Sequence, residues 1–229
     1  MTYIIFSISF IYITLFVSAI MCISTRLANN RPVMFARSRC DQCAKRLRWW
    51  QLIPCIGWLL QLGRCPDCHQ PVSLTYPLAE SLVGLLGALI IHSNPFNTAI
   101  SLVVFNLILL ALACQDATHL AISAWPIVAL LVLALIRHQF SWSKLLMVTT
   151  LYLVSLYFIH RFQFMGNGDV DCIAVLSLMF PIQVAIASIL FASLIALSHF
   201  YLSHQRPNRL PFIPYLFSGL VIVQLYVFI

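Results

Sequence analysis

Four of the eight cysteines form two closely spaced pairs in the long polar stretch that follows the first apolar run. The pairs are Cys40-x-x-Cys43 and Cys65-x-x-Cys68, with 21 residues between them. Each pair can place two thiolates on one face of a tight turn, and four thiolates complete a closed tetrahedral shell around Zn²⁺. Because a closed shell leaves no position for a reacting water, we expect a structural zinc ion. A redox pair and cysteines without a ligand role are the alternatives.

The chain has only six acidic residues, and Asp116 and Asp169 are the pair best suited to chemistry. Asp116 ends an apolar run, and Asp169 follows Gly166-Asn167-Gly168 at the start of another. Ionisable groups at membrane depth are costly and are treated first as functional residues. Two carboxylates facing one cleft can share a proton, so that one activates a water and the other protonates a leaving amide.

The glycines before Asp169 permit backbone conformations that other residues avoid, which would let a substrate or a partner helix approach. The alternative for Asp169 is a simple helix cap. A third acid, Glu80, lies just inside an apolar run, where it could support the catalytic cleft or pair with a loop arginine.

The elements that must position these residues are membrane helices. The chain is 62% hydrophobic and 8% charged, against about 25% charged residues in ordinary soluble domains. This composition excludes a soluble globule, a disordered chain and a small secreted disulfide protein. Continuous apolar runs such as residues 102–114 exclude the alternating pattern of a membrane β-barrel. We therefore predict an all-α integral membrane protein with about eight transmembrane helices.

The apolar runs give the expected boundaries and domains. The first run has no basic segment before it, so we interpret it as a retained helix rather than a signal peptide. The run before Pro181 is short and could continue across that proline as a kinked segment. We predict a first transmembrane helix at 1–25, a cysteine-rich loop at 26–76 and a polytopic domain at 77–229. The runs lie at about 3–24, 77–93, 98–115, 122–136, 142–160, 171–180, 182–203 and 211–229.

Charge predicts the orientation. Eight of the thirteen Lys and Arg residues lie in the first loop, which the positive-inside rule places in the cytoplasm. Alternating helices then return Asp116 and Asp169 to the cytoplasmic face. The reducing cytoplasm disfavours disulfides between the loop cysteines. The net charge of +7 favours contact with anionic lipid headgroups over binding of nucleic acid.

Several segments together resemble the type IV prepilin peptidases, membrane aspartic proteases of the GxGD class. The matching residues run in order from the first loop to the last helix, and together they are far more specific than any one motif. They are Cys40-Asp41-Gln42-Cys43, Leu52-Ile53-Pro54, Gly63-Arg64-Cys65-Pro66-Asp67-Cys68, Tyr76-Pro77-Leu78-Ala79-Glu80, Gln115-Asp116-Ala117-Thr118-His119-Leu120, Gly166-Asn167-Gly168-Asp169 and Leu210-Pro211-Phe212-Ile213-Pro214-Tyr215-Leu216 with Gly219.

The resemblance implies an endopeptidase of the cytoplasmic membrane with Asp116 and Asp169 as its catalytic pair and Gly166, Gly168 and Glu80 as supporting motif residues. Its substrates would be type IV prepilins or pilin-like pseudopilins, cut between a short basic leader and the hydrophobic stem, usually after a glycine. The family's hydrolysis uses no metal. Many members also methylate the new N-terminus with S-adenosylmethionine. The short connections are similar to those of competence-type peptidases.

Three positions depart from the family pattern. Asp171 stands where the family often has a lysine, and its charge would raise the pKa of Asp169 if it faced inward. Ala124 replaces an acid that follows the first aspartate in many members. Gln51 replaces an acid before Leu52-Ile53-Pro54, which weakens the expectation of methyl transfer more than that of proteolysis.

A different class of protein also uses acids within the membrane. A polytopic transporter or a metal-sensing scaffold could carry protons or cations on Asp116 and Asp169, with the cysteine loop as a sensor. Such a protein would act without a peptide substrate.

Overall fold

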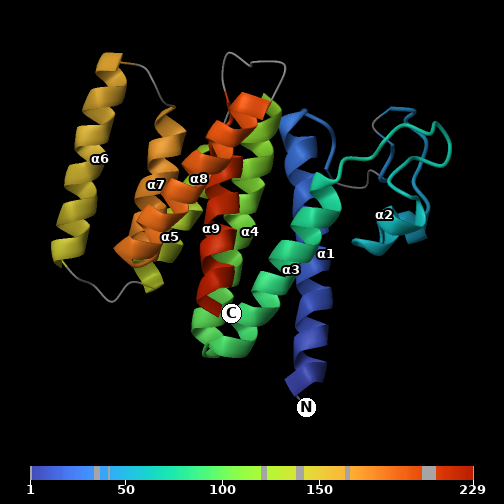
Figure 1. Ribbon diagram of the computed structural model, residues 1–229, viewed down its shortest axis with the longest axis horizontal. Coiled ribbons are helices and arrows are strands. Elements are labelled where there is room, and N and C mark those ends of the chain that lie inside the picture. The colour runs from blue at the N-terminus through green and yellow to red at the C-terminus, as the bar shows by residue number, and fades with distance from the viewer. Residues whose placement is uncertain are drawn as a thin grey trace. The chain divides into compact units, whose positions relative to one another are not determined.

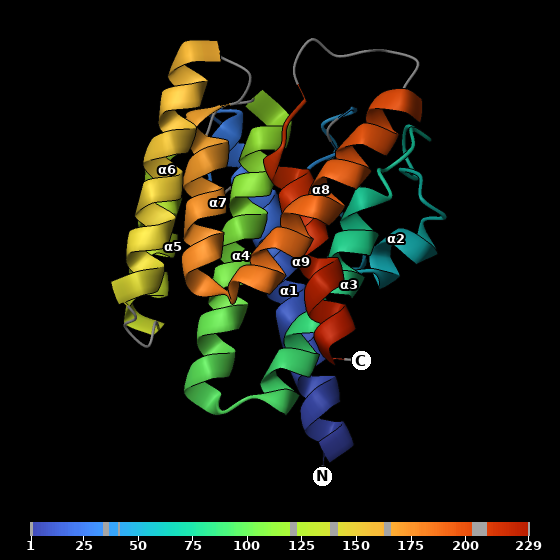
Figure 2. The same ribbon diagram turned by 60° about the vertical axis from the view of Figure 1, so that its left-hand side comes forward.

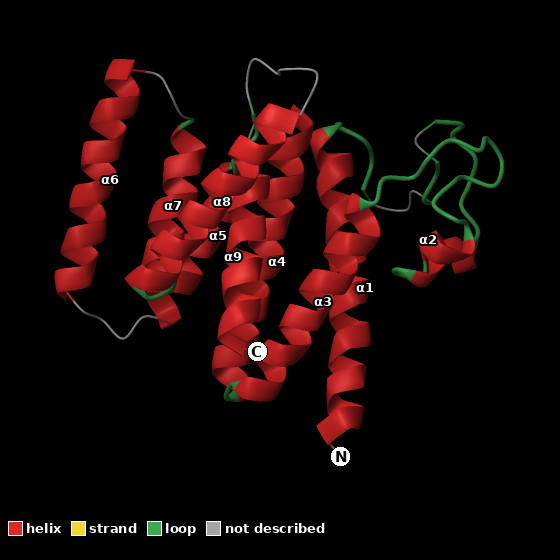
Figure 3. Ribbon diagram, viewed as in Figure 1, coloured by secondary structure: helices red, strands yellow, loops and turns green. Residues whose placement is uncertain are grey.

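The structure is a computed structural model that describes residues 2–33, 37–40, 42–119, 123–137, 142–162, 166–202 and 210–228. Within these ranges the regular elements are helices (Figure 3). The extended pairings described are two isolated β-bridges in the cysteine-rich loop, Arg39 with Arg46 and Arg64 with Pro71. The predicted all-α membrane fold is confirmed.

Each predicted apolar run lies largely within a helix, and the loop adds two short helical segments (Figure 1). The run before Pro181 does not continue across that proline, because its helix ends at Met179 and the next begins at Ile182. The elements are α1 (Thr2–Ala28), η1 (Trp49–Leu52), α2 (Ile56–Leu60), α3 (Thr75–Ser93), α4 (Phe96–His119), α5 (Ala124–Arg137), α6 (Trp142–Phe162), α7 (Asn167–Met179), α8 (Ile182–Leu202) and α9 (Ile213–Phe228).

Five helices of the described chain, α1, α3, α4, α6 and α8, are long and apolar enough to cross a membrane. The apolar helices α5 and α9 are shorter. Helix α7 has 13 residues, which at 1.5 Å per residue is about 20 Å and less than the roughly 30 Å hydrocarbon core. The protein is therefore a multi-pass membrane protein. Helix α7, which carries Asp169 in its first turn, is too short to span the bilayer alone.

The chain forms two compact units, Met1–Pro95 and Phe96–Ile229. In the first unit α1 and α3 pack side by side (Figure 2). Two glycines of α3 allow this close approach, because a side chain at Gly84 would meet Thr14 and one at Gly87 would meet Ile13. Small residues at helix contacts are the usual solution in membranes, where lipid tails are as apolar as the helices themselves. The cysteine-rich loop belongs to this first unit.

In the second unit α4 packs against α5 and α9, and α7 packs against α5, α6 and α8. Helix α8 in turn packs along α9. The contacts therefore follow a closed ring from α4 through α5, α7, α8 and α9 back to α4. The side chain of Lys144 on α6 fixes the far end of α7, since its Nζ donates hydrogen bonds to the carbonyl oxygens of Leu178 at 3.0 Å and Phe180 at 2.8 Å. A cation at a helix C-terminus also favours the helix dipole. This cap was not foreseen from the sequence.

The contact between α8 and α9 depends on Gly219. A Cβ atom at this position would collide with the carbonyl oxygen of Ser188 and the backbone nitrogen of Ala192. Both are backbone atoms of α8, so neither can turn aside as a flexible side chain would. Gly219 therefore sets how closely α9 lies against α8.

We predict that Gly219→Val separates these helices and destabilises the protein by about 1–3 kcal/mol, the usual cost of overpacking a core. The measurement is the midpoint of thermal unfolding in detergent. Ile222→Val is the matched control, because Ile222 lies on the same helix with 42% of its surface exposed. Equal midpoints for the two variants would contradict the assigned helix contact.

Candidate active site and metal centre

The two cysteine pairs form turns with the same backbone geometry. In each, the N–H of the first cysteine donates to the carbonyl oxygen five residues later, from Cys40 to Lys45 and from Cys65 to Gln70, both at 2.9 Å. The residue after the second cysteine has a positive φ, 56° at Ala44 and 57° at His69. The first unit thus contains two turns of the same type, each carrying one cysteine pair and called a knuckle below.

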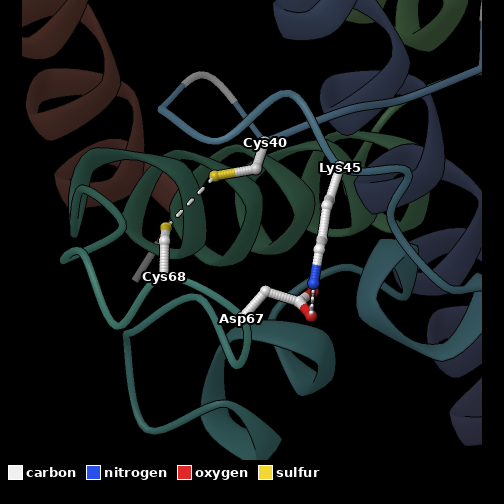
Figure 4. A network of polar contacts seen from close by, with 4 residues as sticks. All are labelled: Cys40, Lys45, Asp67 and Cys68. Atoms are coloured by element: carbon white, nitrogen blue, oxygen red, sulfur yellow. Dashed lines mark hydrogen bonds and ion pairs between the residues drawn. The ribbon is translucent and has the colours of Figure 1, made fainter.

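The four predicted ligands converge on one point. Their Sγ atoms all lie within 4.8 Å of one another, and the Sγ atoms of Cys40 and Cys68 are 3.9 Å apart (Figure 4). With Zn–S bonds of about 2.3 Å, the sulfur atoms of a tetrahedral site lie about 3.8 Å apart. The donor set formed by Cys40, Cys43, Cys65 and Cys68 therefore fits a zinc ion.

Two further contacts favour this arrangement. Hydrogen bonds from the backbone N–H groups of Cys68 and Asp67 lower the pKa of the Cys65 thiol to about 7, which favours the thiolate that binds metals. The Nζ of Lys45 lies 2.7 Å from Oδ1 of Asp67, and this ion pair joins the first knuckle to the second (Figure 4). The pair is exposed and contributes little energy.

Glu80 anchors the loop to α3. This carboxylate is 7% exposed, and its Oε2 accepts a hydrogen bond of 2.7 Å from the N–H of Cys55. Cys55 has a φ of 57° at the centre of a tight turn, in which the Ile56 N–H donates to the Pro54 carbonyl at 2.5 Å. Burial and the nearby Glu80 carboxylate raise the pKa of the Cys55 thiol. Cys55 is therefore kept as a thiol, which donates a hydrogen bond to the Pro77 carbonyl oxygen at 3.6 Å, while its backbone N–H is bonded to Glu80.

Asp116 lies near the end of α4 and is 4% exposed. Its Oδ2 accepts a hydrogen bond of 3.1 Å from the backbone N–H of Ile213, the first residue of α9. The neighbouring Gln115 accepts a 3.0 Å hydrogen bond from the Ser123 hydroxyl, just before α5. These adjacent side chains fasten the end of α4 to the beginnings of two other helices.

Asp169 lies in the first turn of α7 and is half-buried. Its Oδ2 accepts the Gly166 N–H at 3.3 Å, so this carboxylate does cap the helix. The expected special backbone at the glycines is wrong: Gly166 has a φ of −76°, and Gly168 lies within the helix without a positive φ. A Cβ atom at Gly166 would instead approach Asp169 Oδ2 to 3.3 Å. Glycine leaves room for the carboxylate.

The charges of Asp116 and Asp169 interact. Burial and the negative charge of Asp116 together raise the pKa of Asp169 to about 6. Both aspartates belong to the second unit, where α4 and α7 each pack against α5. A carboxyl group whose pKa is raised partly by the charge of a second carboxylate is expected where two acids can share one proton.

Asp171 makes a separate contact. The Tyr152 hydroxyl on α6 donates a hydrogen bond of 2.8 Å to Asp171 Oδ1, so this acid links α7 to α6. Sequence reasoning left its direction open and did not identify Tyr152. Nor did it identify the backbone N–H of Ile213, although Pro214 marks the beginning of that helix.

Comparison with known proteins divides the chain in two. Residues 11–93 match the Bacterial Peptidase A24 N-terminal domain. Residues 103–201 match the Type IV leader peptidase family. The first match includes the four cysteines and Glu80, and the second includes Asp116 and Asp169.

Curated relatives carry the name Prepilin leader peptidase/N-methyltransferase. The protein of Stutzerimonas stutzeri is 31% identical over 198 residues, which cover 78% of this chain and 68% of the relative. The Pseudomonas putida protein is 30% identical with the same coverage, and that of Legionella pneumophila is 31% identical over 81% of this chain and 71% of its own. No solved structure matches significantly. The chain belongs to the type IV prepilin leader peptidase family.

Proposed function

We propose that this protein is a membrane aspartic endopeptidase that removes the leader peptide from type IV prepilins or pilin-like pseudopilins. The observation that carries the proposal is that one unit places two acids at the ends of different helices, buried Asp116 near the end of α4 and half-buried Asp169 in the first turn of α7. Relatives of known name support the substrate class, since they are called prepilin leader peptidases.

The proposed reaction uses one water and both acids. The ionised carboxylate removes a proton from the water, whose oxygen attacks the peptide carbonyl, while the protonated acid donates to the carbonyl oxygen. Collapse of the tetrahedral species breaks the C–N bond, and the leaving amine takes a proton. The raised pKa of Asp169 favours this residue as the acid that holds the shared proton. Asp116, held by the Ile213 N–H, then acts on the water.

We place the reaction at the cytoplasmic face of the inner membrane. This orientation rests on the basic residues of the first loop and the positive-inside rule. The substrate's basic leader would remain in the cytoplasm while its apolar stem lies in the bilayer. The same assay should also measure N-methylation with S-adenosylmethionine, because the names of the relatives include N-methyltransferase.

The metal centre is proposed to be structural. Cys40, Cys43, Cys65 and Cys68 would hold a zinc ion with all four positions filled by sulfur. The ion would stabilise the loop of the first unit, and it has no part in the hydrolysis.

Asp116→Asn and Asp169→Asn should each lower the rate of leader removal by about 10³-fold or more, because either change removes one half of the acid–base pair. The measurement is the rate of cleavage of a model prepilin by purified protein in detergent, followed by product mass. Asp171→Asn is the matched control, since it changes an acid of the same helix that is bonded to Tyr152. We expect this control to retain most of the activity.

Cleavage at a near-normal rate by either of the two asparagine variants would exclude the dyad. Flux of protons or metal ions through the wild-type protein, without peptide cleavage, would favour a transporter instead.

Replacing Cys40 and Cys43 with serine should remove the bound zinc, because two ligands of a four-sulfur site would be lost. Metal analysis of the purified protein should find about one zinc ion per chain in the wild type and close to none in the variant. Cys22→Ser, in α1, controls for the loss of a thiol elsewhere. Equal zinc in both variants would refute the four-cysteine site.

A further inference from the structure

The beginning of α9 has an unusual arrangement of backbone donors. Pro214, the second residue of the helix, has no N–H. The next two N–H groups, of Tyr215 and Leu216, both donate to the Phe212 carbonyl at 3.1 and 3.0 Å. The first turn is therefore left with one N–H directed away from its own helix, that of Ile213.

That donor is bonded to Asp116. Ile213 is 0% exposed and Asp116 is 4% exposed. Bulk water therefore does not hydrogen-bond to the Ile213 N–H or to the Asp116 carboxylate. A buried N–H requires an acceptor, and Asp116 Oδ2 supplies it at 3.1 Å. Among the residues that the structure describes, this is the hydrogen bond of the Asp116 carboxylate, and it is made by Oδ2.

The position of the donor is itself fixed by α8. Gly219 lets α9 approach the backbone of α8 at Ser188 and Ala192. One turn closer to the site, the Tyr215 hydroxyl and His199 Nδ1 on α8 are 2.9 Å apart and form a hydrogen bond. Two contacts on one helix thus hold the N–H that meets Asp116.

We infer that the backbone N–H of Ile213 orients the Asp116 carboxylate for catalysis, and that Pro214 leaves this donor without a competing N–H beside it. Ile213 is thereby a positioning residue that acts through its main chain. The inference rests on the proposed function of Asp116 and Asp169. It also gives a role to the segment Leu210-Pro211-Phe212-Ile213-Pro214, whose bonding partner sequence analysis did not identify.

The test compares Ile213→Pro with Ile213→Ala. Both lose the isoleucine side chain, but only proline lacks the N–H, and proline is well accepted at the first position of a helix. We expect Ile213→Pro to lower kcat for leader removal by about tenfold or more relative to Ile213→Ala. KM should be equal in the two variants. The assay temperature is set well below both unfolding midpoints, because loss of the buried hydrogen bond to Asp116 should itself lower the midpoint of Ile213→Pro. Equal kcat values, or a fall in kcat that is accounted for by unfolded protein at the assay temperature, would overturn the inference.

A second variant keeps the side chain. Incorporating the α-hydroxy analogue of isoleucine at position 213 replaces the amide by an ester, which removes the N–H, puts an oxygen in its place and weakens the Phe212 carbonyl as an acceptor. A fall in kcat of similar size supports the inference, and unchanged kcat overturns it. Asp116→Asn, assayed in parallel, separates the two proposals. An active Asp116→Asn variant would refute the dyad, whereas an inactive one beside unchanged Ile213 variants would refute only the role of Ile213.

Discussion

The constraint on which the structure depends is that a carboxylate buried among apolar helices must find a hydrogen-bond donor. Asp116 is bonded to the N–H of Ile213, and Glu80 to the N–H of Cys55. In both cases the donor is a backbone group at a turn or a helix start, so the acid joins two segments of its unit. A buried carboxylate left without such a partner would cost several kcal/mol. Each acid therefore both requires and fixes the local fold.

The packing of the helices supports these contacts in each unit. In the first unit, Gly84 and Gly87 bring α3 close to α1. Glu80, also on α3, accepts a hydrogen bond from the loop residue Cys55. In the second unit Gly219 brings α9 close to α8, and α9 presents Ile213 to Asp116. At Gly219 the neighbouring atoms are backbone atoms of α8, which cannot move aside as side chains do. The geometry around Asp116 thus depends on a glycine further along the same helix as Ile213.

Much of this could be predicted from the sequence, because it depends on period, composition and spacing. The apolar runs predicted the helices, and the paired cysteines predicted a cluster whose four sulfur atoms converge and could hold a metal ion. What could not be predicted depends on backbone groups and on contacts between distant segments. Ile213 lies 97 residues from Asp116 in the sequence. Its backbone N–H cannot be recognised as a partner from the type of its side chain. The prediction for Gly166 was wrong for a similar reason. Its backbone φ is ordinary, and the absence of a side chain leaves space for the Asp169 carboxylate.

The most direct test of the central claim is the mass of the products formed by the purified protein from a model prepilin in lipid nanodiscs. The account predicts two fragments separated at the junction between the basic leader and the apolar stem, and intact substrate with the double variant Asp116→Asn/Asp169→Asn. The same fragments formed by the double variant, or intact substrate with the wild type, would contradict it.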